Sequence, residues 1–532
     1  MDNPTTAVLI FMLSLLPLGL SAQNTTLETR ISQLEIGKST LEDVVRVFGE
    51  PERYTAGAET LTRDKLPRVY MAVYPDELVF LMSEGRLREI RVGRPGYRFA
   101  GRISVGAPIA ELSSALGAPT GVVKGPMPQN QEPRSGVLYE GGEGSPGYYG
   151  RPDLGVRFFL RDGKVAAIYL TPQRGGKLKE LPRYDPASQD SFQMDLRGAD
   201  LSALDLRGRA ADLLQALFDT RTVWPPRDKL PEGFDPKRIL EFGSNPGLGV
   251  RSLHQRGITG KGVSIALVDN PLLATHKEYA SRIRFHDYIN APKDGEPHFH
   301  GSVVVSVAAG TTLGVAPGAG IYYVSSWAMD REGPDFRPRA KAFEKFLEVN
   351  RTLPPEQKIR VISMSFGWAR NHRGAAEMDA AAKRAKDEGL LVITSNLEQV
   401  HGFRFHGLGR EPLADPDLFE SYLPGEFWAK QFYSGVGGSG RLLVPMDSRT
   451  GAGPAANDEY VFFRRGGWSW AIPYIAGVYA LAVQVDPKIT PDRFWETALT
   501  TGRTIQVRRG DKTHSLGPII DPVRLIAALE KH

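Results

Sequence analysis

The chain of 532 residues contains no cysteine. Disulfide bonds, thiol catalysis and cysteine-based zinc sites are therefore excluded, so stability has to come from core packing. An excess of one charge is also lacking, because 66 Lys and Arg residues face 61 Asp and Glu residues and leave a net charge of +5. Since no basic cluster is interleaved with aromatic residues, we expect no nucleic-acid partner.

Long apolar runs are scarce as well, and the clearest one lies at the N-terminus. Residues 7–20 are almost entirely apolar and lead to a cleavage pattern at positions 20–23 with the small residues Ser21 and Ala22. This pattern is typical of a signal peptide, which we assign to residues 1–22. No Lys or Arg precedes the run, so an uncleaved anchor is the alternative, although the run is short for a membrane span. We expect a periplasmic or secreted protein without membrane insertion.

Three short segments in the second half place an Asp, a His and a Ser at the ends of buried elements. Residues 263–268 are apolar and partly β-branched and end at Asp269, which predicts a buried strand that delivers a carboxylate to a sheet edge. His300 opens a run of small and β-branched residues up to Gly310, which predicts a buried helix with the imidazole at its N-terminal end. Ser469 precedes a second helix of small residues, where its backbone N–H is among the unpaired donors of the first turn.

Each of these side chains also has a structural interpretation. An acid after a strand is often a helix cap or a turn residue, and a serine before a helix is often its N-cap. The pair His298 and His300 invites a metal site, but no third ligand fits, and a catalytic histidine with an exposed neighbour is the simpler interpretation. We therefore expect no metal at this site and no cofactor, and leave structural calcium open.

From about residue 246 to the C-terminus, the chain resembles the subtilisin-like (subtilase, S8-type) serine proteases. Residues 269–279 are similar to the family's Asp-Thr-Gly…His-Pro-Asp-Leu stretch, and residues 300–310 to its His-Gly-Thr-His-Val-Ala-Gly pattern. Residues 314–319 match Gly-Val-Ala-Pro-x-Ala, and residues 361–367 are similar to the strand Val-Ile-Asn-Met-Ser-Leu-Gly. The resemblance implies a catalytic triad of Asp269, His300 and Ser469.

The same resemblance implies further site residues. Asn396 lies where the family keeps its oxyanion asparagine, although a lone Asn in a loop is usually a turn residue. Ser365, Phe366 and Gly367 would line the cleft and pair with the substrate as an added strand.

The fold class follows from the alternation of elements as well. Buried strands at 263–268, 321–325, 360–364 and 390–395 are separated by helical stretches. This order is typical of an α/β domain, with a parallel sheet covered by helices on both faces and active residues at the carboxyl ends of its strands.

Departures from the family pattern leave a second function open. Trp468 and Trp470 flank the serine in place of the usual Thr and Met, Pro271 replaces a glycine, and Val303 replaces a second histidine. None of these changes removes a triad side chain. We predict an exported serine endopeptidase that acts on proteins or peptides. The alternative is a catalytically inactive subtilase-fold binding scaffold, or pseudoprotease. We expect Trp470 in the core and Trp468 partly in the cleft.

Residues 32–172 contain an internal duplication. The capped helix pattern of residues 36–51 recurs at 105–119, and the hairpin pattern of residues 78–90 recurs at 156–168. This duplicated α+β module resembles tandem β-lactamase-inhibitor-like domains and small outer-membrane-assembly lipoprotein domains. No triad lies in it, and we expect a binding or folding module for which a protein is the natural partner.

The segment from 173 to 245 is predicted as a linker because its first part is rich in charge, Gly and Pro. Residues 194–208 carry leucines every five residues and faintly resemble a pentapeptide repeat. Two or three such coils are too few to stand alone, so we expect them to pack on a neighbour. The peptidase domain is assigned to residues 246–532.

Overall fold

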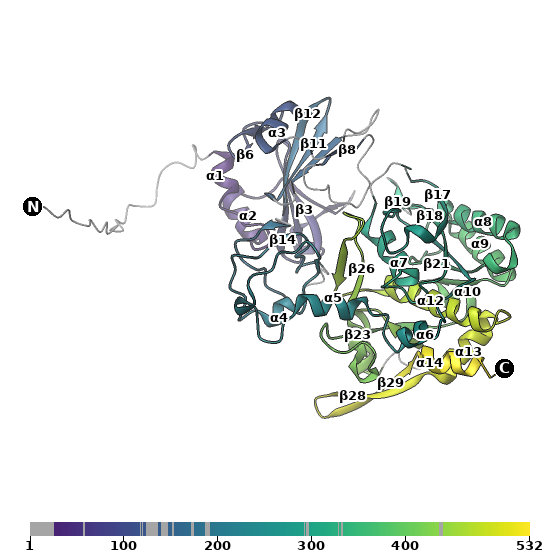
Figure 1. Ribbon diagram of the computed structural model, residues 1–532. Coiled ribbons are helices and arrows are strands. Elements are labelled where there is room, and N and C mark those ends of the chain that lie inside the picture. The colour runs from purple at the N-terminus through teal and green to yellow at the C-terminus, as the bar shows by residue number, and fades with distance from the viewer. Residues whose placement is uncertain are drawn as a thin grey trace, which may run out of the picture. The chain divides into compact units, whose positions relative to one another are not determined.

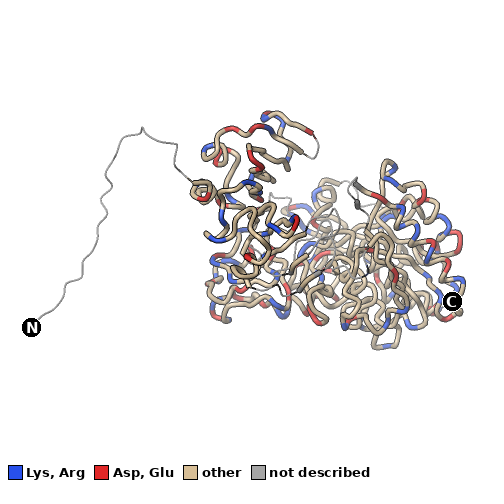
Figure 2. Tube along the Cα trace, turned by 90° about the horizontal axis from the view of Figure 1, so that it is seen from above, with Lys and Arg blue, Asp and Glu red and all other residues tan. Residues whose placement is uncertain are grey.

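The computed structural model describes residues 26–531 apart from 57–58, 118, 120, 124–136, 140–146, 152–153, 172–174, 187–191, 292, 294–296, 328, 331–332 and 436–439. The predicted signal peptide lies outside the described residues. The chain divides into two compact units, of which the first comprises Met1–Ala118 with Phe158–Pro172 and the second comprises Pro119–Arg157 with Gln173–His532. Along the trace of both units, basic and acidic residues are interspersed, in keeping with the balanced composition (Figure 2).

The first unit repeats one motif, a helix followed by a β-hairpin. Helices α2 (Leu41–Phe48) and α3 (Ile109–Leu116) precede the hairpins β4–β5 (Leu78–Ser83, Arg86–Val92) and β11–β12 (Val156–Arg161, Lys164–Leu170). In the first hairpin, the turn residues Glu84 and Gly85 both have positive φ, and so do Asp162 and Gly163 in the second. This is the type I′ geometry that the Glu-Gly and Asp-Gly pairs predict.

These hairpins share one sheet, because β12 pairs antiparallel with β5. Three side chains on strands of this sheet, Phe80, Met82 and Phe158, are fully buried. The remaining elements of this unit are α1 (Leu27–Ile31), β1 (Arg53–Ala56), β2 (Glu59–Leu61), β3 (Val69–Tyr74), β6 (Arg98–Phe99) and β7 (Ile103–Ser104).

One part of the second unit is a stacked segment, which we define as residues 175–245. Strands β13 (Gly176–Lys177) and β14 (Ala199–Asp200) pair in parallel, and a further parallel bridge joins Asp200 to Val223. The regularly spaced Leu196, Leu201 and Leu206 are all buried in one apolar cluster, so the five-residue repeat places leucines in the interior of the stack. The segment that the sequence predicts as a linker therefore contains a core of its own.

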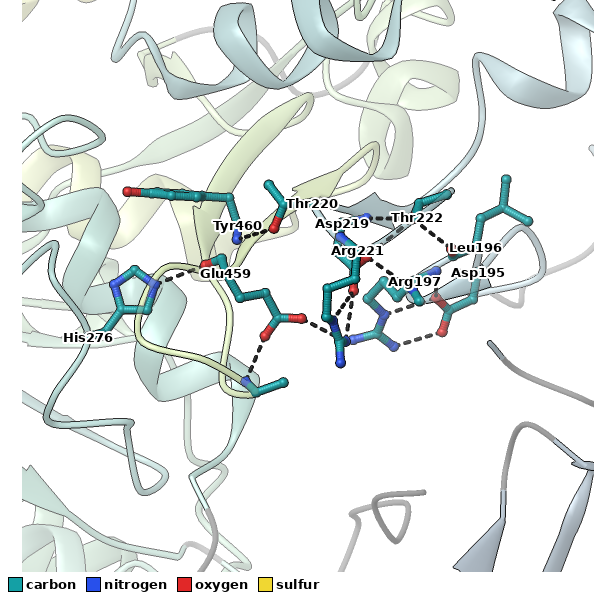
Figure 3. A network of polar contacts seen from close by, with 12 residues as sticks. Asp195, Leu196, Arg197, Asp219, Thr220, Arg221, Thr222, His276, Glu459 and Tyr460 are labelled. Carbon is teal, nitrogen blue, oxygen red and sulfur yellow. Dashed lines mark hydrogen bonds and ion pairs between the residues drawn. The ribbon is translucent and has the colours of Figure 1, made fainter. Parts of the chain in front are cut away.

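This stacked segment joins the following chain through a small sheet. Its strand β15 (Phe218–Asp219) pairs with β27 (Tyr460–Phe463), which pairs with β26 (Arg449–Ala452). Beside this sheet, Arg221 binds two buried carboxylates, Asp219 at 2.8 Å and Glu459 at 2.7 Å (Figure 3). The contact therefore combines backbone pairing with a shared ion pair.

The centre of this unit is a parallel sheet in the order β17-β18-β16-β21-β22, with bounds Ile283–Tyr288, Gly320–Ser325, Ser264–Asp269, Ile359–Met364 and Leu391–Thr394. Alternate residues face different helices. Ile265 and Leu267 pack with α7 (Phe299–Ala309) and α12 (Trp468–Val485). Ala266 and Val268 pack with α8 (Arg337–Thr352) and α9 (Ala375–Asp387). The prediction of a parallel sheet with helices on both faces is confirmed (Figure 1).

The C-terminal part adds a mixed sheet in the order β24-β23-β25-β29-β28. Its bounds are Tyr422–Pro424, Phe405–Arg410, Leu442–Pro445, Lys512–Ile519 and Arg503–Arg509. The side chains of Thr490 and Asp521 cap the helices α13 (Pro491–Thr501) and α14 (Pro522–Leu529) at their N-termini. The remaining elements of the second unit are α4 (Ala210–Leu213), α5 (Pro236–Ser244), α6 (Val250–Gln255), α10 (Leu397–His401), α11 (Glu426–Tyr433), β8 (Gly121–Val123), β9 (Val137–Tyr139), β10 (Gly147–Arg151), β19 (Met329–Asp330) and β20 (Gly333–Pro334).

Helix α12 is the one helix of the described residues that is long and apolar enough to cross a membrane, judged by length and composition. Within this protein, however, 78% of its apolar window is buried. Its residues pack in the main core together with α7, as expected of the central helix of a folded domain.

Candidate active site

Asp269 and His300 meet at the carboxyl edge of the parallel sheet. Asp269 is the last residue of β16, and His300 lies in the first turn of α7. His300 Nδ1 lies 2.7 Å from Asp269 Oδ1, with the carboxylate fully buried and the imidazole side chain 14% exposed. Burial by itself would raise the pKa of Asp269, but the charge and hydrogen bond of His300, the charge of Arg339 and the N–H of Asn270 hold it below its usual value. An ionised Asp269 therefore accepts from Nδ1–H, which leaves Nε2 as the acceptor nitrogen.

His298 organises the start of the same helix. As the N-cap of α7, its Nδ1 accepts from the backbone N–H of His300 at 3.1 Å. The Nδ2 of Asn270 donates to the same nitrogen. Burial first, and then the charge of His300, lower the pKa of His298 to about 4, which keeps this nitrogen unprotonated near neutral pH. The interpretation of His298 as an exposed neighbour is wrong, because the residue is partly buried and acts as a helix cap.

Ser469 lies in the first turn of α12. Two glycines precede this helix, and the backbone there requires both of them. Gly467 is the N-cap, with φ of 65°. A Cβ on Gly466 would lie 2.2 Å from the carbonyl oxygen of Met446 and 2.2 Å from the indole of Trp470. No side chain fits there, so the glycines let the chain turn sharply before the serine.

Three contacts bring His300 and Ser469 into one site. The ring of Trp470, the next residue after the serine, lies 5.4 Å from the imidazole, and the ring of Phe366 lies 5.2 Å from it. Ser365 Oγ donates to the carbonyl oxygen of Ser469 at 2.9 Å. Within the described residues, no hydrogen bond joins the side chains of His300 and Ser469. Such bonds often form only when substrate is bound.

Asn396 lies beside this site, but its side chain is fully engaged. Its Oδ1 accepts from the N–H of Trp368 at 2.8 Å, and its Nδ2 donates to the carbonyl of Trp368 at 2.8 Å and to Gln399 Oε1 at 2.9 Å. Gln399 is held in turn by Asp379. Both amide hydrogens are used, so Asn396 has to release one partner before it can donate to an oxyanion.

The residues that depart from the family pattern fit the site without disturbing it. Trp470 is 3% exposed and packs against Phe463, whereas Trp468 is partly buried between Phe405 and His406. The carbonyl of Pro271 accepts from His298 N at 2.6 Å. Trp470 is thus a core residue, and Trp468 keeps part of its surface open.

Arg339 is a member of the site that sequence reasoning missed. It is fully buried near the start of α8, and its guanidinium carbon lies 3.6 Å from the centroid of the Phe366 ring. The sequence offered one signal for its burial. Arg339 lies one helical turn before Phe343, on the apolar face of the amphipathic helix α8.

The site can be compared with known proteins. Residues 260–418, which include Asp269, His300 and Asn396, match the model of the subtilase family, Peptidase_S8. The subtilisin-like protease PopC of Myxococcus xanthus (strain DK1622) is 25% identical over 266 residues, which are 44% of this chain and 54% of that protein. The extracellular serine proteinase of Thermus sp. (strain Rt41A) is 25% identical over 240 residues, with the same two shares.

The chain therefore spans about half the length of these curated relatives. Among solved structures, the prenylagaramide maturation protease PagA is similar over 53% of this chain and 98% of its own, with a TM-score of 0.37 and 16% identity. The sequence prediction of a subtilisin-like segment is confirmed by the family match. The resemblance of residues 32–172 to other domains stays a prediction.

Proposed function

We propose that the chain is an exported serine endopeptidase. The observation that carries the proposal is the buried pair of Asp269 and His300 at the sheet edge, 2.7 Å apart, with Ser469 in the first turn of the adjoining helix α12. The match to the subtilase family and the two protease relatives support a serine peptidase. A relative described as extracellular and the apolar run at residues 7–20 support export.

The proposed chemistry uses only side chains of the chain itself. Ser469 Oγ attacks the scissile carbonyl, and its proton passes to Nε2 of His300, which later donates it to the leaving amine. Asp269 holds the imidazole in the tautomer with hydrogen on Nδ1 and stabilises the imidazolium that forms. The N–H of Ser469 and the amide of Asn396 donate to the oxyanion of the tetrahedral intermediate.

The substrate in this proposal is a protein or peptide in extended form. Ser365, Phe366 and Gly367 follow directly on β21 and would pair with its backbone. Phe366 contacts His300, so a chain bound along this segment passes beside the imidazole. The N-terminal module would bind a protein.

A second candidate function is a binding scaffold without catalysis. The observation that favours it is the engaged amide of Asn396, together with the lack of a described hydrogen bond between His300 and Ser469. In that case the cleft would hold a peptide and leave it intact.

Covalent labelling separates the two functions. We expect a serine-directed fluorophosphonate to label the full chain, Ser469→Ala to abolish labelling and peptide hydrolysis, and Ser434→Ala to leave both unchanged, since Ser434 is exposed at the end of α11. A folded wild-type protein that binds peptides without labelling would establish the scaffold.

A further inference from the structure

A positive charge is buried behind the Asp269–His300 pair. Arg339 has no exposed surface, and its Nη2 donates to the carbonyl of Ser326 at 3.2 Å and to Asn270 Oδ1 at 3.4 Å. Its Nε and Nη1 have no hydrogen-bond partner among the described residues. Burying a charged group with unpaired donors is costly, so a compensating interaction has to be found among its neighbours.

Two neighbours supply that compensation. The guanidinium lies 3.6 Å over the Phe366 ring, an arrangement that favours a cation. The charge of Asp269 favours the cation as well, and although burial lowers the pKa of Arg339 to about 10, the group stays charged near neutral pH. In the part of the chain that the structure describes, Oδ2 of Asp269 also has no hydrogen-bond partner. Arg339 and Asp269 therefore interact through their opposite charges and not through a direct hydrogen bond.

Two further titratable groups near Asp269, Tyr323 and His298, are neutral near neutral pH. Burial raises the pKa of Tyr323 on β18 well above its usual value. Burial, with the charge of His300 second, lowers the pKa of His298 to about 4. His300 and Arg339 are therefore the two described groups that can balance the buried carboxylate, and Arg339 does so at every stage of a proton transfer through His300.

Arg339 is also linked to the imidazole of His300 by the ring of Phe366, which contacts both side chains. Phe366 is packed between the guanidinium at 3.6 Å and the ring of His300 at 5.2 Å. Since Phe366 directly follows β21, its ring links the segment that is proposed to bind substrate to both Arg339 and His300.

We propose that Arg339 is a positioning residue for the proposed peptidase reaction, which holds Asp269 as a carboxylate and fixes Phe366 against His300. The inference rests on the proposed function, in which His300 must be neutral and aligned to accept the serine proton. Removal of the buried charge leaves Asp269 with less compensation and favours a proton on the Asp269–His300 pair.

The test compares Arg339→Gln, which keeps a hydrogen-bond donor without charge, with Arg339→Lys, which keeps the charge. The matched control is Lys341→Met, an exposed residue of the same helix. The fluorophosphonate labelling rate is measured from pH 5 to 9. We expect the Gln variant to label at least about tenfold more slowly at pH 7, with the acid limb of its profile moved up by about one pH unit. In Arg339→Lys, we expect the acid limb of the pH profile to return to its wild-type position, and the labelling rate to recover only in part.

A second readout does not depend on hydrolysis. The imidazole titration of His300 is followed by ¹⁵N-histidine NMR in the Ser469→Ala background, with the signal assigned by its loss in His300→Gln. We expect the midpoint to rise in Arg339→Gln and to return in Arg339→Lys. An unchanged midpoint, or a rate lost equally at every pH, would overturn the inference. If Arg339→Gln shifts the NMR midpoint but the wild-type protein is never labelled, only the proposed function is overturned.

Discussion

The side-chain amide of Asn396 and the backbone of Trp368 are joined by two opposed hydrogen bonds, each 2.8 Å long. The third bond of this amide, to Gln399, uses its remaining hydrogen. A side chain held by three hydrogen bonds is rigid, but its donors point at the protein and not at a substrate. The bond to Gln399 is the one that can be removed without altering the backbone.

The first prediction follows from this arrangement. Gln399→Ala frees one hydrogen of Asn396, so we expect peptide hydrolysis to rise, by a factor of a few. Asn396→Ala should lower kcat by about 10²–10³, as the loss of an oxyanion donor does elsewhere. Steady-state kinetics of both variants provide the measurement. Equal rates in Asn396→Ala and wild type would exclude an oxyanion role for Asn396.

The second prediction concerns the turn before Ser469. Gly466→Ala places a methyl group 2.2 Å from the carbonyl oxygen of Met446, so the turn has to shift. We expect a loss of about 1–3 kcal/mol in the free energy of unfolding, together with most of the labelling. Gly208→Ala is the control, since no atom of the described residues lies within 4 Å of its added methyl. Denaturant unfolding checks the result, and a Gly466→Ala protein as stable as the control would contradict it.

The third prediction concerns the cap of α7. His298→Ala leaves the N–H of His300 without its acceptor, so we expect about 1 kcal/mol of lost stability and slower labelling. His298→Asn offers an oxygen in the same place and should recover most of the stability. Thermal unfolding of the two variants tests this directly. If Ala and Asn behave alike, the cap contributes nothing.

The fourth prediction is a pH dependence at Asp447. Its carboxylate accepts from Gly466 N at 2.8 Å and from Glu426 N at 3.2 Å, and burial raises its pKa to about 6 from the usual 3.8. Between these two values the folded protein binds a proton that the unfolded chain does not bind. The contribution of Asp447 to stability therefore rises as the pH falls from about 7 to 4, by up to about 3 kcal/mol.

Comparison with Asp447→Asn isolates this effect from other carboxylates. We expect the stability of wild type relative to this variant to increase between pH 7.5 and pH 5, whereas the exposed Asp458→Asn should show no such trend. Unfolding by urea at several pH values is the measurement. A constant or decreasing difference would refute the raised pKa.

The fifth prediction concerns the ion pair in Figure 3. Arg221→Gln leaves Asp219 and Glu459 buried together without their cation. Because Arg221 itself is half exposed, we expect a loss of about 1–3 kcal/mol, less than a fully buried pair would cost. Burial, and in addition the charge of Asp219, raises the pKa of Glu459. The loss of stability in Arg221→Gln should therefore become smaller on acidification, because the Glu459 carboxylate takes up a proton.

Arg207→Gln is the matched control for this variant. Arg207 pairs with Asp205 at the same spacing along the chain as Arg221 with Asp219, but both members are exposed. Thermal unfolding at pH 5 and pH 7.5 should show no loss in the control. A loss in Arg221→Gln that grows on acidification would contradict the assignment.

The sequence predicted those parts of the fold that depend on local pattern. The apolar run before Asp269 and the small residues after His300 belong to β16 and α7, because a buried strand or helix requires apolar side chains along its whole length. Strand β17 was missed, since Ile283–Tyr288 lies at the sheet edge and its residues are only partly buried.

What the sequence could not predict are the partners of polar side chains. An arginine such as Arg339 is expected at the surface, and only the arrangement of α8 against β16 brings it to Asp269. The engagement of Asn396 depends on Trp368 and Gln399, which the chain brings together by folding. The matches to known family motifs supply residue positions but not these contacts.

The pairing of β15 with β27 has a consequence for truncated forms of the chain. Phe218 packs on Phe462 with ring centroids 5.3 Å apart, and Phe462 is 1% exposed. A recombinant fragment that starts at residue 246 would lose this strand, uncover Phe462 and strip Glu459 of Arg221. A fragment for crystallisation or activity assays should therefore start before Gly176, where the first strand of the stack begins.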